Sequence, residues 1–213
     1  MKKKVLTLIS LLFLAPFVLA NNWGIGIKAG ITQNNPKGMQ DAYDEAYDYG
    51  YDSAKLTKNR AVFGVEALYE RGSTDKIGVK LGAEMYGQNK LELSNLYGDS
   101  FTAKEDTYMF PLTAYYKKDN GIGRLSWFAG AGFTLINTKM KEKEKDYYDD
   151  YKQTYSTSKL FPHLTAGAEY RFTQVFALGI EAKWNINAKV KKYGWVISDH
   201  SGLGAAVTGR FYF

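Results

Sequence analysis

Eight stretches of the sequence alternate an apolar residue with a polar or small one, and this alternation limits the chain to few folds. Successive side chains of a β-strand point to opposite faces, so each stretch predicts a strand with one apolar face. The expected strands cover residues 23–31, 61–70, 76–87, 106–116, 124–137, 160–172, 175–188 and 201–213. Pro111 falls inside the fourth strand, and because proline cannot donate a hydrogen bond to a sheet, we expect a β-bulge there.

The connections between these strands alternate between long and short. Four polar stretches, residues 34–59, 89–105, 139–158 and 189–200, are long, whereas the other connections are turns of a few residues. In an antiparallel meander every second connection lies at the same end, so the four long ones share one end. The sequence therefore predicts a single all-β domain built as an up-and-down meander.

The first twenty residues have the pattern of an export signal. Three lysines follow Met1, an almost wholly apolar run occupies residues 5–19, and small residues lie around Ala20. The apolar run is shorter than the roughly 20 residues that a membrane-spanning helix needs. We therefore interpret residues 1–20 as a cleaved signal peptide and residues 21–213 as the mature domain.

The composition excludes several classes of site and partner. The chain has no Cys, which excludes a disulfide scaffold and a Cys-ligated metal in an exported protein. The net charge is +6, and three of the lysines belong to the expected signal. The remaining positive charge is too small and too evenly mixed with acids to imply nucleic acid. Two distant histidines do not make a metal site, and we expect no metal and no cofactor.

The last stretch, residues 201–213, reads SGLGAAVTGRFYF and places Phe211 and Phe213 two residues apart at its end. It resembles the closing strand of bacterial outer-membrane β-barrels, where that strand is also the signal read by the barrel-assembly machinery. On that resemblance, Phe211 and Phe213 are the expected assembly signal. The alternative for this stretch alone is the terminal strand of a soluble sandwich.

Taken together, the strands, loops and termini resemble the small eight-stranded barrels of the OmpA transmembrane-domain and OmpX type. The resemblance implies an eight-stranded antiparallel up-and-down transmembrane β-barrel with short periplasmic turns and long extracellular loops. It places the protein in the cell outer membrane, among outer-membrane lipid and lipopolysaccharide. We expect it to be a monomer.

The two faces of the expected strands differ in a way that predicts which one is inside. Aromatic residues near the strand ends mark the apolar face, as in interfacial girdles, whereas the other face is rich in glycine and charge. Glycine weakens a solvent-facing strand, and a base facing lipid costs about 2–4 kcal/mol at the midplane, so both belong in a narrow lumen. The charges expected there are Lys28, Glu66, Lys80, Glu84, Glu169, Glu181, Lys183 and Arg210. Four acids and four bases predict a paired plug and no large pore, the alternative being that some are solvated near the mouths.

An enzymatic reading rests on two residues. Outer-membrane barrels include lipid A deacylases, acyltransferases and proteases, and only His163 and His200 offer an imidazole base. The parity of His163 directs it into the upper lumen, away from a membrane lipid, and His200 precedes Ser201 at the outer rim. A triad is defined by geometry that the sequence does not give. We therefore expect no enzyme, and keep a lipid A-modifying enzyme as the alternative.

Two tracts in the long connections, residues 41–52 and 146–155, combine Tyr with Asp. Tyr offers a large amphipathic contact area at low entropic cost, which suits recognition of a host or surface ligand. The candidate recognition residues are Tyr43, Tyr47, Tyr49, Tyr51, Tyr147, Tyr148 and Tyr151. We expect a non-enzymatic surface protein with a structural or adhesin-type role. The alternative for these tracts is a hydrophilic brush, or upper strand ends that rise above the membrane.

Overall fold

The structure is a computed structural model of the whole chain, and it describes residues 23–33, 35–120, 124–145, 150–192 and 195–213. The expected signal peptide at residues 1–20 lies outside the described residues, as do Tyr147 and Tyr148. Among the described residues, no helix has the length and apolar composition needed to cross a membrane.

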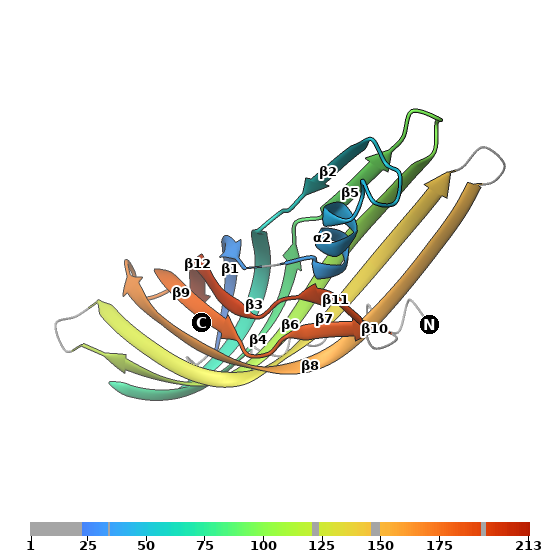
Figure 1. Cartoon of the computed structure of the whole chain (residues 1–213). Coiled ribbons are helices and arrows are strands. Elements are labelled where there is room, and N and C mark those ends of the chain that lie inside the picture. The colour runs from blue at the N-terminus through green and yellow to red at the C-terminus, as the bar shows by residue number, and fades with distance from the viewer. Residues whose placement is uncertain (1–22, 34, 121–123, 146–149, 193–194) are drawn as a thin grey trace, which may run out of the picture.

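Eight antiparallel strands form a closed ring. They are β1 (Trp23–Thr32), β3 (Ala61–Gly72), β4 (Asp75–Tyr86), β6 (Ser100–Asp119), β7 (Leu125–Lys145), β8 (Asp150–Arg171), β9 (Phe176–Asn185) and β12 (Gly202–Tyr212). Each ring strand pairs with the next one along the chain, and β12 pairs with β1 to close the ring (Figure 1). The up-and-down eight-stranded barrel predicted from the alternation is confirmed.

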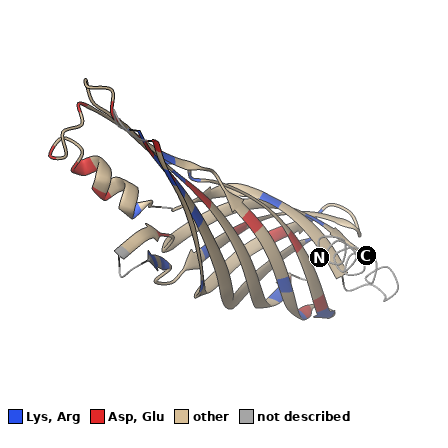
Figure 2. Ribbon diagram, turned by 90° about the vertical axis from the view of Figure 1, so that its right-hand side faces the viewer, with Lys and Arg blue, Asp and Glu red and all other residues tan. Residues whose placement is uncertain are grey.

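The alternation sorts the side chains of each strand between two environments. Outward-pointing apolar residues are exposed, such as Ile27 and Phe63. The residues between them point inward and are buried, such as Lys28 and Glu66. Figure 2 shows acidic and basic positions interspersed along the barrel strands. The ring is therefore apolar outside and charged inside, the reverse of a soluble barrel.

The expected β-bulge at Pro111 is wrong. Leu81 pairs with Leu112 and Glu84 with Met109, so the β4–β6 register is the same on both sides of the proline. The inward face of β4 carries Gly82 at this height, and a Cβ there would lie 3.0 Å from Pro111 Cγ. The absence of a side chain at Gly82, rather than an extra residue in a bulge, makes room for the pyrrolidine ring of Pro111.

The long connections are ordered, which corrects the expectation of four polar loops. They contain α2 (Lys37–Asp44), β2 (Ser53–Thr57), β5 (Asn89–Ser94), β10 (Lys189–Lys192) and β11 (Trp195–Asp199). In addition, β6, β7 and β8 continue well beyond the barrel, over residues that were expected to be loop. In the added length of β7, Lys and Glu alternate with a period of two over residues 141–145. Because both residue types are polar, no hydrophobic contrast in the sequence marks this part of the strand.

These additions form what we call the raised sheet: β2, β5, and residues 100–106 of β6, 139–145 of β7 and 150–156 of β8. It stands above one end of the barrel (Figure 1). Its inner face carries a small core that includes Leu91, Ala103 and Met140, and Met39 of α2 packs into it. The raised sheet is therefore held in place by its own hydrophobic cluster.

Candidate functional site

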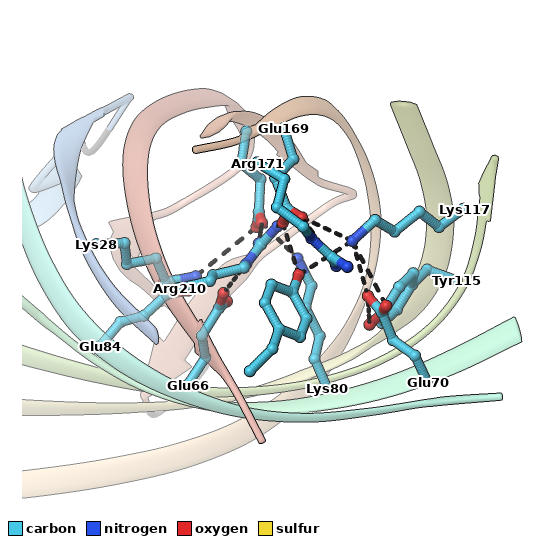
Figure 3. A network of polar contacts seen from close by, with 12 residues as sticks. Lys28, Glu66, Glu70, Lys80, Glu84, Tyr115, Lys117, Glu169, Arg171 and Arg210 are labelled. Carbon is cyan, nitrogen blue, oxygen red and sulfur yellow. Dashed lines mark hydrogen bonds and ion pairs between the residues drawn. The ribbon is translucent and has the colours of Figure 1, made fainter. Parts of the chain in front are cut away.

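The lumen of the barrel holds a first cluster of charges around Arg210. Arg210 Nε donates to Glu66 Oε1 at 2.6 Å, Nη1 to Glu169 Oε2 at 3.0 Å and Nη2 to Glu181 Oε2 at 3.1 Å. The three acids come from β3, β8 and β9, so one guanidinium ties three strands of the ring to β12 (Figure 3). Arg suits this role because its planar fork presents donors in several fixed directions.

The other charges expected in the lumen join this cluster. Lys28 Nζ lies 2.5 Å from Glu84 Oε1 and 3.7 Å from Glu181 Oε1. Lys80 pairs with Glu181, and Lys183 pairs with Glu84. The structure thus brings all eight expected lumen charges together in paired contacts.

A second cluster lies near the end of the barrel opposite the raised sheet, and the sequence did not lead us to expect it. Lys117 Nζ donates to Glu70 Oε1 at 3.1 Å, Glu169 Oε1 at 2.8 Å and Tyr212 Oη at 3.0 Å (Figure 3). Tyr115 Oη also donates to Glu70 Oε1, at 2.9 Å. The expected fourth strand ended at residue 116, which left Lys117 outside it, although its parity matches that of Tyr115.

Little space remains between the side chains of the first cluster, whereas a recess of ≈ 440 Å³ is lined in part by Glu70 and Tyr212 of the second. A recess lined by Lys28, Glu84, Tyr86, Glu181 and Lys183 has a volume of ≈ 20 Å³. A cavity needs roughly 10–15 Å³ to hold one water, so this recess has room for about one. The Phe128 ring takes up further space: its centroid lies 5.1 Å from Lys80 Nζ and 5.0 Å from Arg210 Cζ.

The two histidines lie at different places in the upper barrel. His163 points inward from β8, as its parity predicts, and its Nε2 and Nδ1 lie 2.8 Å and 2.9 Å from the hydroxyls of Thr113 and Thr134. Both ring nitrogens are therefore bound to hydroxyl groups from neighbouring strands. No carboxylate of the described residues is hydrogen-bonded to this imidazole in the structure.

His200 lies between β11 and β12 at the outer mouth, where Ser198 and Glu105 are also buried. Ser198 Oγ is 3.0 Å from His200 Nε2 and 3.1 Å from Glu105 Oε1. The carboxylate thus contacts the serine instead of orienting the imidazole, which differs from a catalytic triad. Burial lowers the pKa of His200 to about 4, so the ring is neutral at pH 7.

The candidate recognition tyrosines have different surroundings. Tyr47, Tyr49 and Tyr151 are well exposed, whereas Tyr43 is just over a third exposed. Tyr51 packs against the core on the inner face of the raised sheet. The expected recognition set is thus divided between solvent and core.

A more exposed pair was missed. Leu96 and Tyr97, at the turn between β5 and β6, are 88% and 87% exposed, more than any other large apolar side chain of the described residues. The turn is built by hydrogen bonds: Asn95 Oδ1 accepts from the backbone N–H of Tyr97 and Asp99, and Asp52 Oδ2 accepts from that of Leu96. We call Leu96 and Tyr97 the tip pair. The residues 95–99 read NLYGD, and the Asn and Gly of that run are the turn signal that could have indicated the hairpin.

The two phenylalanines of the expected assembly signal lie at the end of the closing strand. Phe211 points outward, and its ring centroid is 5.1 Å from that of Phe176 on β9. The backbone N–H of Phe213 donates to Trp23 O at 2.9 Å, which extends the pairing of β12 with β1. Their role in assembly stays a prediction.

The model of the family described as outer membrane protein beta-barrel domain matches residues 5–210. The chain belongs to this family. It is therefore an outer-membrane protein, and its exposed apolar belt faces lipid. The extracellular placement of the long connections, and with them of the raised sheet, stays a prediction. No curated protein sequence matches it significantly.

Several solved outer-membrane proteins are similar to this barrel in structure. OprG from Pseudomonas aeruginosa has a TM-score of 0.54 at 12% identity, covering 91% of this chain and 96% of that one. Ail, the attachment invasion locus protein of Yersinia pestis, has a TM-score of 0.48 at 14% identity, covering 91% and 99%. At such identities the OprG likeness supports the fold alone.

Proposed function

We propose that this protein is a non-enzymatic outer-membrane barrel with a filled lumen that attaches to an extracellular partner through the tip of its raised sheet. The observation that carries the proposal is the tip pair. Two large apolar side chains held in solvent by a hydrogen-bonded turn are costly to keep exposed unless they contact something. A few anchor residues, among which Tyr is enriched, supply most of the binding energy at protein interfaces.

The order of the raised sheet supports recognition over a hydrophilic brush. A brush needs no fixed shape, whereas this sheet has a continuous hydrogen-bond register and a core against α2. A pre-ordered surface loses less conformational entropy on binding.

The filled lumen supports a structural role for the barrel itself. Each of the eight lumen charges has an oppositely charged partner on another strand. Buried charges without partners are strongly unfavourable, so the network holds the ring closed only as a complete set. The alternative function, a lipid A-modifying enzyme, has weaker support, because Glu105 contacts Ser198 and not His200.

Replacing Leu96 and Tyr97 together by Ser is expected to reduce attachment at least tenfold, because interface anchors are worth about 2 kcal/mol or more each. The measurement is binding of cells that display the protein to cultured epithelial cells and to a panel of immobilised matrix proteins. Barrel assembly, followed by the heat-dependent gel shift, should not change, since both side chains lie in solvent.

The matched control replaces Tyr47 and Tyr49 by Ser, which removes two exposed aromatics elsewhere on the same side of the membrane. It is expected to reduce attachment less than the tip change does. Attachment unchanged in the tip variant, with normal surface display, would contradict the proposal. An altered lipid A mass in cells with the parent protein would favour the enzyme instead.

A further inference from the structure

The outer face of the raised sheet is strongly basic. It is the upward continuation of the lipid-facing surface, since the parity that exposes Tyr108 and Leu135 also places the next outward residues on this face. The lysines on it are Lys55, Lys90, Lys104, Lys139, Lys141, Lys143, Lys145 and Lys152, and the acids are Glu92, Asp106 and Asp150. We call this set the lysine face.

Strand pairing explains how the sequence builds the lysine face. On β7 the residues KMKEKEK alternate, so Lys139, Lys141, Lys143 and Lys145 point outward while Glu142 and Glu144 have the opposite parity. A run of mixed charge thus places its four lysines on one side of the sheet and its two glutamates on the other.

Only part of this charge is neutralised within the described residues. Three ion pairs lie on the face: Lys90 with Glu92 at 2.5 Å, Lys141 with Asp106 at 3.2 Å and Lys143 with Asp150 at 3.8 Å. The lysines without an ion pair to a described residue are Lys55, Lys104, Lys139, Lys145 and Lys152.

The lysines also lie beside one another in a way that does not favour folding. Lys90 pairs with Lys104, and Lys104 pairs with Lys141, so three lysines form one row across β5, β6 and β7. Like charges directly opposite each other destabilise a sheet. The hydrogen bond from Lys90 holds the pKa of Glu92 below its ordinary value, and the charges of Lys55 and Lys104 act in the same direction.

With the raised sheet on the extracellular side, as proposed above, the spacing along β6 places this row at the height of the lipid headgroups. Lys104 lies four residues above Tyr108, the last outward aromatic of β6. Four residues of a strand tilted by about 40° rise about 10 Å, just above the hydrocarbon edge. Lipid headgroups occupy the layer directly outside the hydrocarbon core.

We propose that the lysine face binds the phosphate groups of the glycolipids in the outer leaflet around the barrel. Charge complementarity and continuity with the lipid-facing belt both point to this occupant. The phosphates neutralise the row formed by Lys90, Lys104 and Lys141 and fix the height and orientation of the raised sheet. Each basic residue near an anionic membrane surface adds on the order of fivefold in affinity.

The test compares lipid retained by the purified full-length protein. Parent and the triple variant Lys90→Gln, Lys104→Gln, Lys141→Gln are exchanged into phosphatidylcholine micelles with lipid A that carries either both phosphates or none, and bound lipid A is quantified by mass spectrometry. The control triple is Lys37→Gln, Lys159→Gln, Lys191→Gln, exposed lysines on the same side of the membrane but outside the lysine face. Thermal unfolding without lipid A is measured for all three proteins.

We expect the lysine-face variant to retain at least tenfold less phosphorylated lipid A than the parent, with dephosphorylated lipid A retained weakly and equally by both. Its stability without lipid A should be unchanged or higher, since repulsion is removed, which a merely structural role would not produce. Equal retention by parent and variant, or an equal loss in the control triple, would overturn the proposal. Heparin binding lost with lipid A retention unchanged would assign the face to a soluble polyanion instead.

Discussion

Replacing Glu181 by Lys is expected to remove most of the folded barrel from the outer membrane. Glu181 accepts from Arg210 Nη2 at 3.1 Å, pairs with Lys80 and lies 3.7 Å from Lys28 Nζ. The change places a fourth cation beside Lys28, Lys80 and Arg210, which all contact the Glu181 carboxylate in the parent. Breaking a buried ion pair by removing one partner costs about 3–5 kcal/mol, and reversing its charge costs more. That loss is comparable to the whole stability of many domains.

The measurement is the fraction of heat-modifiable protein on gels, together with urea unfolding in micelles. The matched control is Glu144→Lys, the same change at an exposed position on the raised sheet, and it should shift the urea midpoint little. A Glu181→Lys barrel that folds and unfolds like the parent would show that the lumen charges do not depend on one another.

The second large effect is expected from Lys117→Met. Met fills a similar volume but leaves Glu70 and Glu169 without the ammonium that lies 3.1 Å and 2.8 Å from them. Lys117 is 1% exposed, so water cannot take its place without rearrangement. We expect a loss of about 3–5 kcal/mol in the free energy of unfolding, measured by urea titration in micelles.

A second change separates charge from packing at this site. Adding Glu70→Gln to Lys117→Met removes one of the two carboxylates and should recover part of the lost stability, because that buried carboxylate has lost its nearest cation. If the double variant instead has a lower free energy of unfolding than Lys117→Met alone, the cost comes from packing. The electrostatic account of this cluster would then be wrong.

The barrel was predictable because its strands alternate between residues of very different polarity. On β1, Ile25 and Ile27 face lipid while Gly26 and Lys28 face the lumen, and that contrast exists in the sequence itself. Membrane and lumen impose opposite requirements on neighbouring residues. The same contrast gave the inward placement of Glu66 and Arg210.

The part of the raised sheet built from residues 141–145 of β7 was not predictable by that route, since the residues on both of its faces are polar. On β5, Leu91 and Leu93 do alternate with polar residues, and this short strand was missed. Lys141 and Glu142 alternate as regularly as any barrel pair, but neither is apolar, and only pairing with β6 and β8 makes them a strand. Lys117 was missed because the expected strand ended at Tyr116, next to the residues 118–121 that predict a turn, whereas β6 continues to Asp119. Which acid each lumen base contacts depends on ring closure, which no local pattern encodes.

The central claim, that paired charges fill the lumen, is tested most directly by single-channel recording of the parent protein in planar bilayers. Arg210, Lys80 and Lys117 reach their carboxylate partners across the lumen, and we expect these ion pairs to block a continuous water path. The account predicts the absence of a steady conductance of the size that water-filled porins show. A large, steady conductance from the correctly folded barrel would contradict it.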